Sequence, residues 1–318
     1  MSALATRLRG ANVLTIGDVM LDEYVWGQVS RISPEAPVPI VAVDRRTHLP
    51  GGAGNAAAGV AALEANSVLC SIVGDDPAGD RLQSALTDCG IDCRGMVVEP
   101  ERVTTVKTRV IAHSQQVVRT DFEERRPLSD KVEDELIASI RAAVDSVDAV
   151  LISDYAKGIV SPRVAQETIG AARKRDIPVV VDPKGRDYTK YRGAAVLTPN
   201  VLDTEHAVNL HIESYEDLVE AGRRLQESLD GAQLLVTRGA EGMTLLTSDG
   251  PIDIAAESHD VYDVTGAGDT VVAVLAVALG RGLELEAAVR LANAAAGLAV
   301  GRVGAARITL GELVDAAS

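Results

Sequence analysis

The chain has 318 residues, of which 47% are hydrophobic and 24% are charged, as in an ordinary globular protein. Its formal net charge of −15 argues against nucleic acid or an acidic membrane surface as a partner, because both would repel it. Three cysteines, no apolar signal-peptide core in residues 1–12 and no apolar run longer than 271–279 together predict a cytoplasmic protein without a disulfide framework or membrane anchor.

The first predicted strand covers residues 12–17, a short apolar run that ends in a glycine. Asp18 and Asp22 follow it. In an open α/β sheet, ligands bind beyond the carboxyl ends of the strands, where a carboxylate can accept hydrogen bonds from ligand hydroxyl groups. We therefore consider both residues candidates for ligand binding. The alternative is that they are loop aspartates that contact water.

Two later segments do not fit the alternation of strands and helices. Three prolines within residues 34–39 exclude a helix there, and residues 24–29 and 38–43 resemble strands, as do 104–111 and 116–122. We expect the segments of about 23–47 and 104–122 to pair as a small separate sheet. Such a sheet would act as a lid that excludes water from a site below it. Its basic residues are candidates for holding an anionic ligand, or else belong to a solvated strand face: Lys107, Arg109 and Arg119.

The stretch Gly51-Gly52-Ala53-Gly54-Asn55 lies between these segments and precedes an alanine-rich helix that ends near residue 65. Its glycines permit close approach of a small polar ligand, and Asn55 can both donate and accept hydrogen bonds. The glycine spacing does not fit the dinucleotide motif G-x-G-x-x-G, which argues against a nicotinamide oxidoreductase. The motif G-x-x-x-x-G-K-[ST] is also absent from the sequence, so any use of ATP requires another phosphate site.

From residue 129 onward, strands and helices alternate regularly. We predict helices over 129–146, 161–174 and 214–229, strands over 149–153, 179–182, 194–197 and 234–236, and a hairpin within 243–257. Strands separated by helices imply a parallel sheet, and a core with a single Phe and a single Trp suits one. Polar residues follow each strand and should gather in one crevice: Asp154, Lys157, Asp182, Lys184, Asn200, Thr237 and Asp269.

The stretch Asp263-Val264-Thr265-Gly266-Ala267-Gly268-Asp269 predicts a tight glycine turn that leads into a helix over 266–281. With Thr265 as N-cap, the free N–H groups of residues 266–268 and the helix dipole would form an anion site, most simply for phosphate. Asp269 beside that site would take a proton from an attacking hydroxyl group. The alternative is an ordinary solvated helix start.

A second helix is predicted over 284–301. It carries Asn293-Ala294-Ala295-Ala296-Gly297, a face of small residues that would let a flat ring approach. The alternative is close packing against a neighbouring helix.

The stretches 51–55 and 263–269 resemble the two signatures of the ribokinase-like (PfkB) carbohydrate kinases, and the likeness spans nearly the whole chain. This resemblance implies an α/β ribokinase-like fold, with a mostly parallel central sheet flanked by helices and a small β-sheet lid. Residues 1–318 would form a single kinase domain. The family uses ATP and Mg²⁺, and a monovalent cation is a further expectation. We also expect a homodimer through the lid, because lid sheets with an exposed apolar face often pair.

Further motifs, at 17–22, 31–39, 151–158, 182–185 and 198–200, are similar to those of the heptose 7-phosphate kinases within this family. The resemblance implies transfer of the γ-phosphoryl group of ATP to O1 of D-glycero-β-D-manno-heptose 7-phosphate, a step toward ADP-heptose for lipopolysaccharide. Because the sequence ends at residue 318, we expect the kinase without an adenylyltransferase domain. The alternatives are a kinase for another sugar or sugar phosphate and a non-catalytic sugar-phosphate sensor.

The resemblance also implies a role for individual residues. Asp269 would be the base, and the N–H groups of Gly266, Ala267 and Gly268 would stabilise the transferred phosphoryl group. The sugar phosphate would lie among Asp18, Asp22, Gly51, Gly52, Asn55, Lys107 and Asp154. ATP would lie among Lys184, Asn200, Thr237, Gly239, Asp263, Thr265 and Asn293. The family's N-x-x-E element for Mg²⁺ is here Asn200-Val201-Leu202-Asp203, one methylene shorter, so Glu205 is considered beside Asp203 as a metal ligand.

Overall fold

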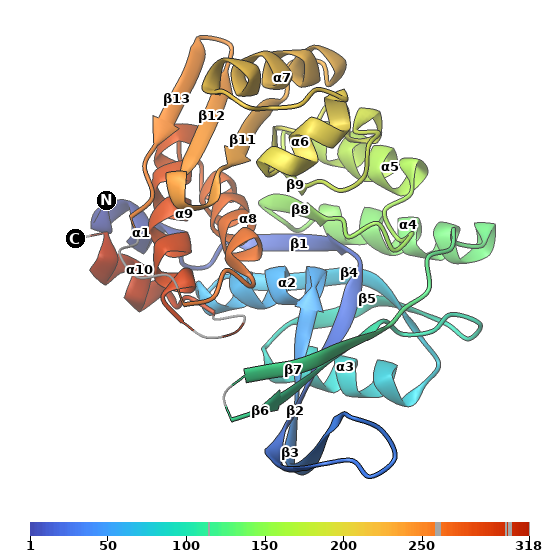
Figure 1. Cartoon of the computed structure of the whole chain (residues 1–318). Helices are drawn as coiled ribbons and strands as arrows, with labels where there is room; N and C mark the ends of the chain where they lie inside the picture. Colours follow the sequence, from blue (N-terminus) through green and yellow to red (C-terminus); the bar gives the residue numbers. More distant parts are fainter. Residues whose placement is uncertain (114, 258–261, 303, 305–306, 318) are drawn as a thin grey trace.

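The computed structural model describes residues 1–113, 115–257, 262–302, 304 and 307–317 (Figure 1). The strands are β1 (Asn12–Gly17), β2 (Val19–Ile32), β3 (Pro39–Gly52), β4 (Asn66–Gly74), β5 (Asp92–Glu99), β6 (Val106–Ala112), β7 (Gln115–Phe122), β8 (Ala149–Ser153), β9 (Val179–Asp182), β10 (Val196–Leu197), β11 (Gln233–Thr237), β12 (Met243–Thr247) and β13 (Gly250–Ile254). The α-helices are α1 (Ser2–Ala5), α2 (Ala53–Ala62), α3 (Pro77–Asp88), α4 (Asp130–Val144), α5 (Pro162–Arg173), α6 (Val201–Val208), α7 (Tyr215–Ser228), α8 (Ala267–Gly280), α9 (Leu285–Val300) and α10 (Leu310–Ala316). Short 3-10 helices are η1 (Thr6–Leu8), η2 (Thr189–Tyr191) and η3 (Gly239–Glu241).

In the described part of the chain, nine strands form one sheet in the order β13-β12-β11-β10-β9-β8-β1-β4-β5. Neighbouring strands from β11 to β5 are parallel, whereas the β11-β12 and β12-β13 pairs are antiparallel. The mostly parallel central sheet predicted from the sequence is therefore confirmed. The predicted hairpin in 243–257 is the β12-β13 pair, which forms one edge of this sheet.

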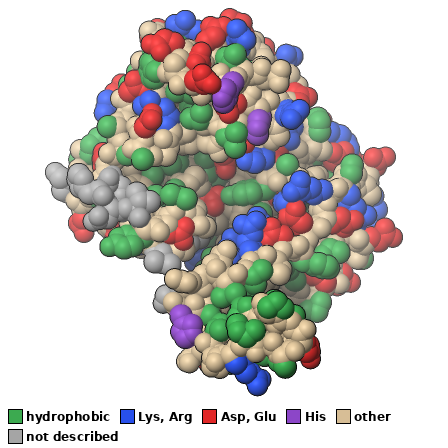
Figure 2. Space-filling model, viewed as in Figure 1, with side chains coloured by type: hydrophobic (Ala, Val, Ile, Leu, Met, Phe, Trp, Pro, Cys, Tyr) green, Lys and Arg blue, Asp and Glu red, His purple; other side chains and the backbone are tan. Residues whose placement is uncertain are grey.

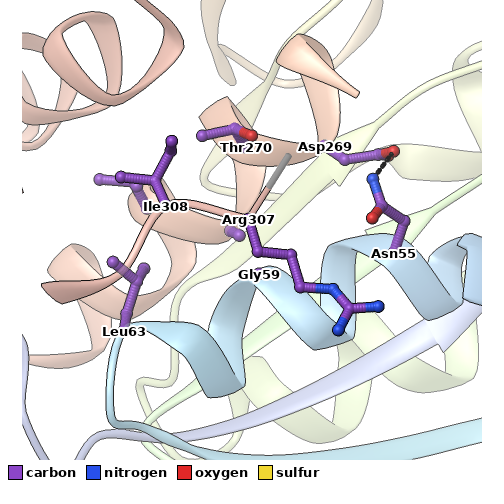
Figure 3. Close-up of a pocket in the computed structure, with 9 residues that line it drawn as sticks. Asn55, Gly59, Leu63, Asp269, Thr270, Arg307 and Ile308 are labelled. Atoms are coloured by element: carbon purple, nitrogen blue, oxygen red, sulfur yellow. Dashed lines mark hydrogen bonds between the residues drawn. The ribbon is translucent and has the colours of Figure 1, made fainter. Parts of the chain in front are cut away.

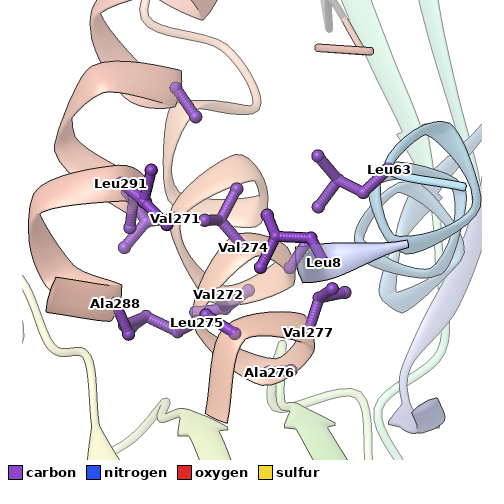
Figure 4. Packing of buried hydrophobic residues seen from close by; sticks show 14 of the residues in the cluster. Leu8, Leu63, Val271, Val272, Val274, Leu275, Ala276, Val277, Ala288 and Leu291 are labelled. Carbon is purple, nitrogen blue, oxygen red and sulfur yellow. The ribbon is translucent and has the colours of Figure 1, made fainter. Parts of the chain in front are cut away.

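Helices cover both faces of the sheet (Figure 1). One face packs α2, α8 and α9 over a cluster of small and branched side chains that includes Val272, Leu275 and Leu291 (Figure 4). The other face packs α4, α5 and α7 over a cluster that includes Leu136 and Ile169. Because both faces are covered, the side chains of a central strand such as β8 are buried at every position, as parallel sheets require.

Serine caps fix the starts of three helices on the second face. The hydroxyl oxygens of Ser129, Ser161 and Ser214 accept backbone N–H groups in the first turns of α4, α5 and α7. A cap of this kind satisfies one of the N–H groups that a helix start leaves without an intrahelical partner. The sequence therefore marks these helix starts within a residue or two, although the predicted helix over 129–146 ends two residues beyond α4.

Four described strands outside the main sheet form a second sheet in the order β3-β2-β6-β7, called here the small sheet. It lies at the bottom of the view in Figure 1, below the ends of the central strands. The separate sheet was predicted, but its strands extend further than 23–47, because the β2-β3 pairing continues to Val19 and Gly52. Asp22 and Gly51 consequently lie within the strands of the small sheet, at the end nearest the main body.

The sequence analysis did not predict β5, α6 or α10. β5 is an edge strand that mixes polar and apolar residues, of which Val97 and Glu99 are buried, so its sequence lacks a continuous apolar run. α6 and α10 are short, with eight and seven residues, and carry too few turns for a clear helical period. No helix among the described residues combines the length and the apolar character needed to cross a membrane.

Candidate active site

Two adjoining clefts lie where the central strands end and α8 begins. The acidic cleft, of about 210 Å³, is lined by Asp154, Tyr155, Asp182, Pro183, Lys184, Thr198, Asn200, Asp203, Thr237, Gly268 and Val271. The apolar cleft, of about 420 Å³, lies beside it and shares Thr237, Gly268 and Val271 with it. Figure 2 shows a hollow on this side of the molecule with basic and acidic side chains along its walls. Of the residues expected to share one crevice, Asp154, Asp182, Lys184, Asn200 and Thr237 line the acidic cleft, whereas Lys157 and Asp269 line neither cleft.

The turn before α8 differs in two details from the expectation. Its N-cap is Gly266, in the left-handed region at φ 80°, and not Thr265. Thr265 is exposed, and its N–H donates to Asp263 Oδ1 at 2.9 Å, while the Gly304 N–H donates to Asp263 Oδ2 at 2.9 Å. A residue with a side chain is strained at that φ, so a glycine is required where the chain enters the helix. Asp263 thus holds the turn together from within the protein.

The amides at the start of α8 are only partly free. The Ala267 N–H donates to the Val264 carbonyl at 3.3 Å, which corrects the expectation of three free amides. The N–H groups of Gly266 and Gly268 have no hydrogen-bond partner among the residues that the structure describes. Gly268 lines both clefts. The helix start can therefore offer amides and the positive end of its dipole to an anion that lies across the two clefts.

Asp269, in the first turn of α8, is 8% exposed and accepts two hydrogen bonds from distant parts of the chain. Asn55 Nδ2, from the first turn of α2, donates to its Oδ2 at 2.7 Å (Figure 3), and the Tyr155 hydroxyl donates to its Oδ1 at 2.7 Å. Burial raises the pKa of Asp269 to about 6, while the bonds from Asn55 and Tyr155 act in the opposite direction. The carboxylate is therefore ionised at neutral pH, and its pKa is near the value that suits a general base.

The residues predicted to hold a sugar phosphate meet at the inner end of the small sheet. Asp22 on β2 lies opposite Lys107 on β6, and the Arg109 guanidinium donates to Asp22 Oδ1 at 2.6 Å. Burial, followed by the charge of Lys157, lowers the pKa of Lys107. The Lys107 ammonium group has no hydrogen bond or ion pair with any described residue. It is thus a half-buried cation that can accept an anionic partner.

Glycine is required at both positions before α2. A Cβ on Gly51 would lie 2.5 Å from Asp22 Oδ2, and one on Gly52 would lie 2.4 Å from the Asp18 carbonyl oxygen. Gly52 is also in the left-handed region, at φ 58°. These two glycines let the backbone pass close to the carboxylate of Asp22 and start α2 with Asn55 turned toward Asp269.

Asp18 does not lie on the surface of either cleft, in contrast to the expectation that it contacts the sugar. Its side chain is 0% exposed and accepts backbone N–H groups from Tyr155 at 2.8 Å, Lys157 at 3.2 Å and Ile159 at 3.1 Å. Burial and the nearby Asp154 raise the pKa of Asp18 to about 6. Its observed role is to hold the loop that follows β8.

Three carboxylates border the acidic cleft. The Asp154 carboxylate accepts hydrogen bonds from the Lys190 ammonium group and the Tyr191 hydroxyl, and Asp154 lines the acidic cleft. It was predicted to lie with Asp22 among the residues that hold the sugar phosphate. Lys184 Nζ is bonded to both carboxylate oxygens of Asp203 at 2.8 and 3.0 Å.

The Asp182 carboxylate has no hydrogen-bond partner among the described side chains and amides. Burial raises its pKa well above the usual range, and the charges of Asp269 and Asp203 act in the same direction. An unpaired carboxylate in an acidic cleft fits a hydrated divalent cation, although no group of three metal-ligating side chains is present in the described residues.

The two predicted metal ligands lie in different places. Asn200 caps α6 by accepting the Asp203 N–H on Oδ1 at 2.7 Å, and both residues line the acidic cleft. Glu205 pairs with His211 and accepts the Ile212 N–H at 2.7 Å, and it lines neither cleft. Glu205 therefore lies away from Asp203 and the acidic cleft, because residues two apart point to different sides of a helix.

The apolar cleft is lined by three of the predicted nucleotide residues, whereas Asp263 and Thr265 line neither cleft. Thr237, Gly239 and Asn293 line it together with the small residues Ala296 and Gly297. Asn293 Nδ2 donates to the Ala255 carbonyl at 2.8 Å, which fixes the orientation of its amide group. The walls are mainly apolar, so the cleft suits a flat aromatic base.

Tyr155 is the functional residue that sequence reasoning missed. The sequence analysis selected Asp154 and Lys157 because charged residues after a strand are a clear signal. A tyrosine in the same loop carries no such signal, because its aromatic ring is as common in a core as in a site.

The family model described as pfkB family carbohydrate kinase matches residues 11–310. The chain is 46% identical over 315 residues to the bifunctional protein HldE of Geotalea uraniireducens, which covers 99% of this chain and 64% of that protein. It is 47% identical over 304 residues to the bifunctional protein HldE of Geobacter sulfurreducens, covering 95% and 62%. The chain thus spans less than two thirds of the length of these relatives.

Solved structures show the same fold. Arabidopsis thaliana ribokinase complexed with ribose and ATP superposes with a TM-score of 0.75 at 22% identity, covering 96% of this chain and 98% of that one. Phosphofructokinase-2 from Escherichia coli in complex with potassium superposes with a TM-score of 0.77 at 20% identity, covering 96% and 97%. These likenesses confirm the predicted ribokinase-like fold. With the family model matching nearly its whole length, the chain belongs to the pfkB family of carbohydrate kinases, phosphotransferases that use an alcohol group as acceptor.

Proposed function

We propose that this protein transfers the γ-phosphoryl group of ATP to the O1 hydroxyl of D-glycero-β-D-manno-heptose 7-phosphate, with Asp269 as the general base. The observation that carries the proposal is the position of Asp269: its carboxylate lies in the first turn of α8, between Asn55 of α2 and the helix start that borders both clefts. A base at that point can deprotonate an acceptor hydroxyl beside the phosphoryl group that it attacks.

In this proposal the apolar cleft holds the adenine base, and the phosphates extend past Gly268 into the acidic cleft. Thr237, Gly239 and Asn293 would surround the nucleotide, and the free amides of Gly266 and Gly268 would stabilise the negative charge that is transferred. Mg²⁺, when bound, would neutralise phosphate charge. Asp182 and Asp203, which line the acidic cleft, would hold it.

The acceptor would lie between Asp269 and the inner end of the small sheet. Asp22 would accept hydrogen bonds from sugar hydroxyl groups, while Lys107 would bind the 7-phosphate, since its ammonium group has no partner among the described residues. The choice of heptose 7-phosphate is supported by the motifs at 151–158 and 182–185, which resemble those of heptose 7-phosphate kinases, and by the identity to the bifunctional HldE proteins. A non-catalytic sugar-phosphate sensor is the second candidate, because the same clefts could bind both ligands without reaction.

The small sheet is proposed to act both as a lid and as a dimerisation surface. It exposes large apolar side chains, including Ile32, Val118 and Phe122, the last 65% exposed. Pairing two such sheets would bury them. A cytoplasmic location and a dependence on a monovalent cation complete the proposal.

A phosphoryl-transfer assay tests the proposal. The purified protein is incubated with MgATP and a panel of heptose 7-phosphate, heptose, mannose 6-phosphate, fructose 6-phosphate and ribose, with and without K⁺. ADP release and the phosphorus NMR spectrum of the product are followed. We expect turnover with heptose 7-phosphate above all others and a new anomeric phosphate signal. Preference for another sugar refutes the substrate assignment, and tight binding of both ligands without any turnover favours the sensor.

A further inference from the structure

The loop after β8 reaches the proposed base through a tyrosine. The Tyr155 hydroxyl donates to Asp269 Oδ1 at 2.7 Å, and Asn55 Nδ2 donates to Oδ2 at the same distance. Each oxygen of the Asp269 carboxylate therefore accepts one hydrogen bond from the protein, Oδ1 from Tyr155 and Oδ2 from Asn55. Because a carboxylate oxygen has two acceptor positions, a sugar hydroxyl can still donate to Asp269 while both bonds remain.

The backbone of this loop is held from beneath by Asp18. Its carboxylate accepts the N–H groups of Tyr155, Lys157 and Ile159. Ala156, between them, adopts the left-handed region at φ 54°, and its N–H donates to Asp154 Oδ1 at 2.6 Å. Hydrogen bonds from three backbone amides to one fully buried carboxylate restrict the motion of the loop. The Tyr155 side chain is therefore held in a defined position beside Asp269.

The same loop also contacts the end of the small sheet. The Lys157 ammonium group is bonded to Glu123, the residue directly after β7. The buried guanidinium of Arg102 donates to the Lys157 carbonyl at 3.4 Å and to Glu99 at 2.6 Å. The loop therefore connects the segment that leaves the small sheet to the carboxylate of Asp269.

We infer that Tyr155 is a positioning residue for the base, which orients the carboxylate of Asp269 and stabilises its ionised form through a direct hydrogen bond. This inference depends on the proposed function for its catalytic meaning, but the hydrogen bond itself can be tested without substrate. It assigns Asp18 a matching role, since Asp18 holds the loop that carries the tyrosine.

The physical reason lies in the burial of Asp269. A carboxylate that is 8% exposed has little water to stabilise its charge, so protein donors must do so. A hydrogen bond to the charged form favours that form, and the Tyr155 hydroxyl itself stays protonated, because burial and the charge of Asp269 raise its pKa well above the usual value. Loss of the hydroxyl would leave Oδ1 without this donor and raise the pKa of Asp269.

The test is the variant Tyr155→Phe, which keeps the ring and removes only the hydroxyl. Protein labelled with ¹³C at the aspartate carboxyl carbons is titrated by NMR, and the signal missing from Asp269→Asn identifies Asp269. We expect the midpoint of that signal to rise by about one pH unit in Tyr155→Phe, the scale of a hydrogen bond to a charged group. In the kinase assay, the pH profile of kcat/KM should have its acid limb shifted to higher pH by the same amount, while KM for ATP stays unchanged.

Tyr188→Phe is the matched control. Tyr188 is 2% exposed, and its hydroxyl has no partner among the described residues, so the change removes a buried hydroxyl that does not contact Asp269. Its Asp269 midpoint should match that of the wild type. Thermal unfolding of both variants confirms that each is folded.

The outcomes separate the two hypotheses. An unchanged Asp269 midpoint in folded Tyr155→Phe overturns the positioning role, whatever the enzyme does. A raised midpoint without turnover of any sugar by the wild type supports the contact but overturns the proposed function. A raised midpoint with an acid limb that does not move shows that Tyr155 does not act through the base in catalysis, and this too refutes the inference.

Discussion

The variant Asp269→Asn separates the chemical role of the carboxylate from its effect on stability. Burial raises the pKa of Asp269 from an ordinary value of 3.8 to about 6. A carboxyl group whose pKa is higher in the folded state begins to cost stability as the pH rises above its unfolded-state pKa, and the cost is complete once the pH exceeds the folded-state pKa. At 1.36 kcal/mol per pH unit, keeping Asp269 ionised at pH 7 costs about 3 kcal/mol of folding free energy.

Asparagine has nearly the same shape and carries no charge, so this cost is absent from the variant. Its amide can still pair with Tyr155 and Asn55 after rotation of the hydroxyl and amide groups. We therefore expect Asp269→Asn to unfold at a temperature no lower than that of the wild type, and a few degrees higher if the whole cost is recovered. Any gain should shrink as the pH falls from 6 to 4, where Asp269 becomes protonated in the wild type.

Turnover should change in the opposite direction. Loss of a general base lowers kcat by about two to four decades, or about 3–5 kcal/mol of activation free energy. ADP release measures the rate, calorimetry with ATP verifies that the nucleotide still binds, and differential scanning calorimetry measures the unfolding temperature. Near-normal turnover would refute Asp269 as the base. A large loss of activity together with a lower unfolding temperature would refute the separation of the two roles.

Three further predictions concern the surroundings of the site. Lys107→Ala should raise KM for a phosphorylated sugar at least tenfold and leave KM for ATP nearly unchanged, since the lost ammonium group lies on β6 and not in the apolar cleft; equal effects on both constants would remove Lys107 from the sugar site. Gly51→Ala places a Cβ 2.5 Å from Asp22 Oδ2 and should displace that carboxylate from Arg109. We expect a higher KM for the sugar substrate as a result. Gly170→Ala on α5 is the control, because a Cβ there meets nothing within 4 Å, and it should leave the kinetic constants unchanged. Leu275→Ala, in the core beneath the site, should lower the free energy of unfolding by about 2–5 kcal/mol in urea titrations, and a value under 1 kcal/mol would contradict the packing of α8.

The parts of the fold that were predictable share one property: their pattern is local. Strands such as β8 and β9 are short apolar runs that end in charged residues, and serines mark several helix starts. The small sheet was predicted from its prolines and extended segments, but not its length, because the pairing of Val19 with Gly52 joins residues 33 positions apart. Edge strand β5 was missed because its polar and apolar residues are mixed, and its place at the edge of the sheet is set by strands distant in the sequence.

The site shows the same division between local and distant information. The glycine turn before α8 and Asn55 were identified because glycine and asparagine have few ordinary reasons to occur in such patterns. The partners of these residues could not be predicted, because the hydrogen bonds from Asn55 and Tyr155 to Asp269 cross 214 and 114 positions of the chain. Asp18 was placed in the sugar site from its position after β1. Only the fold shows that three amides of a distant loop already occupy its carboxylate.

Asp22 and Gly51 belong to strands of the small sheet itself, whereas both clefts are built entirely from the main body. A molecule bound to the carboxylate of Asp22 therefore contacts the small sheet, and a molecule confined to the clefts does not. For the design of inhibitors, this means that a nucleotide mimic competes for a surface of the main body alone. A mimic of the acceptor would in addition contact the strands that carry Asp22 and Gly51.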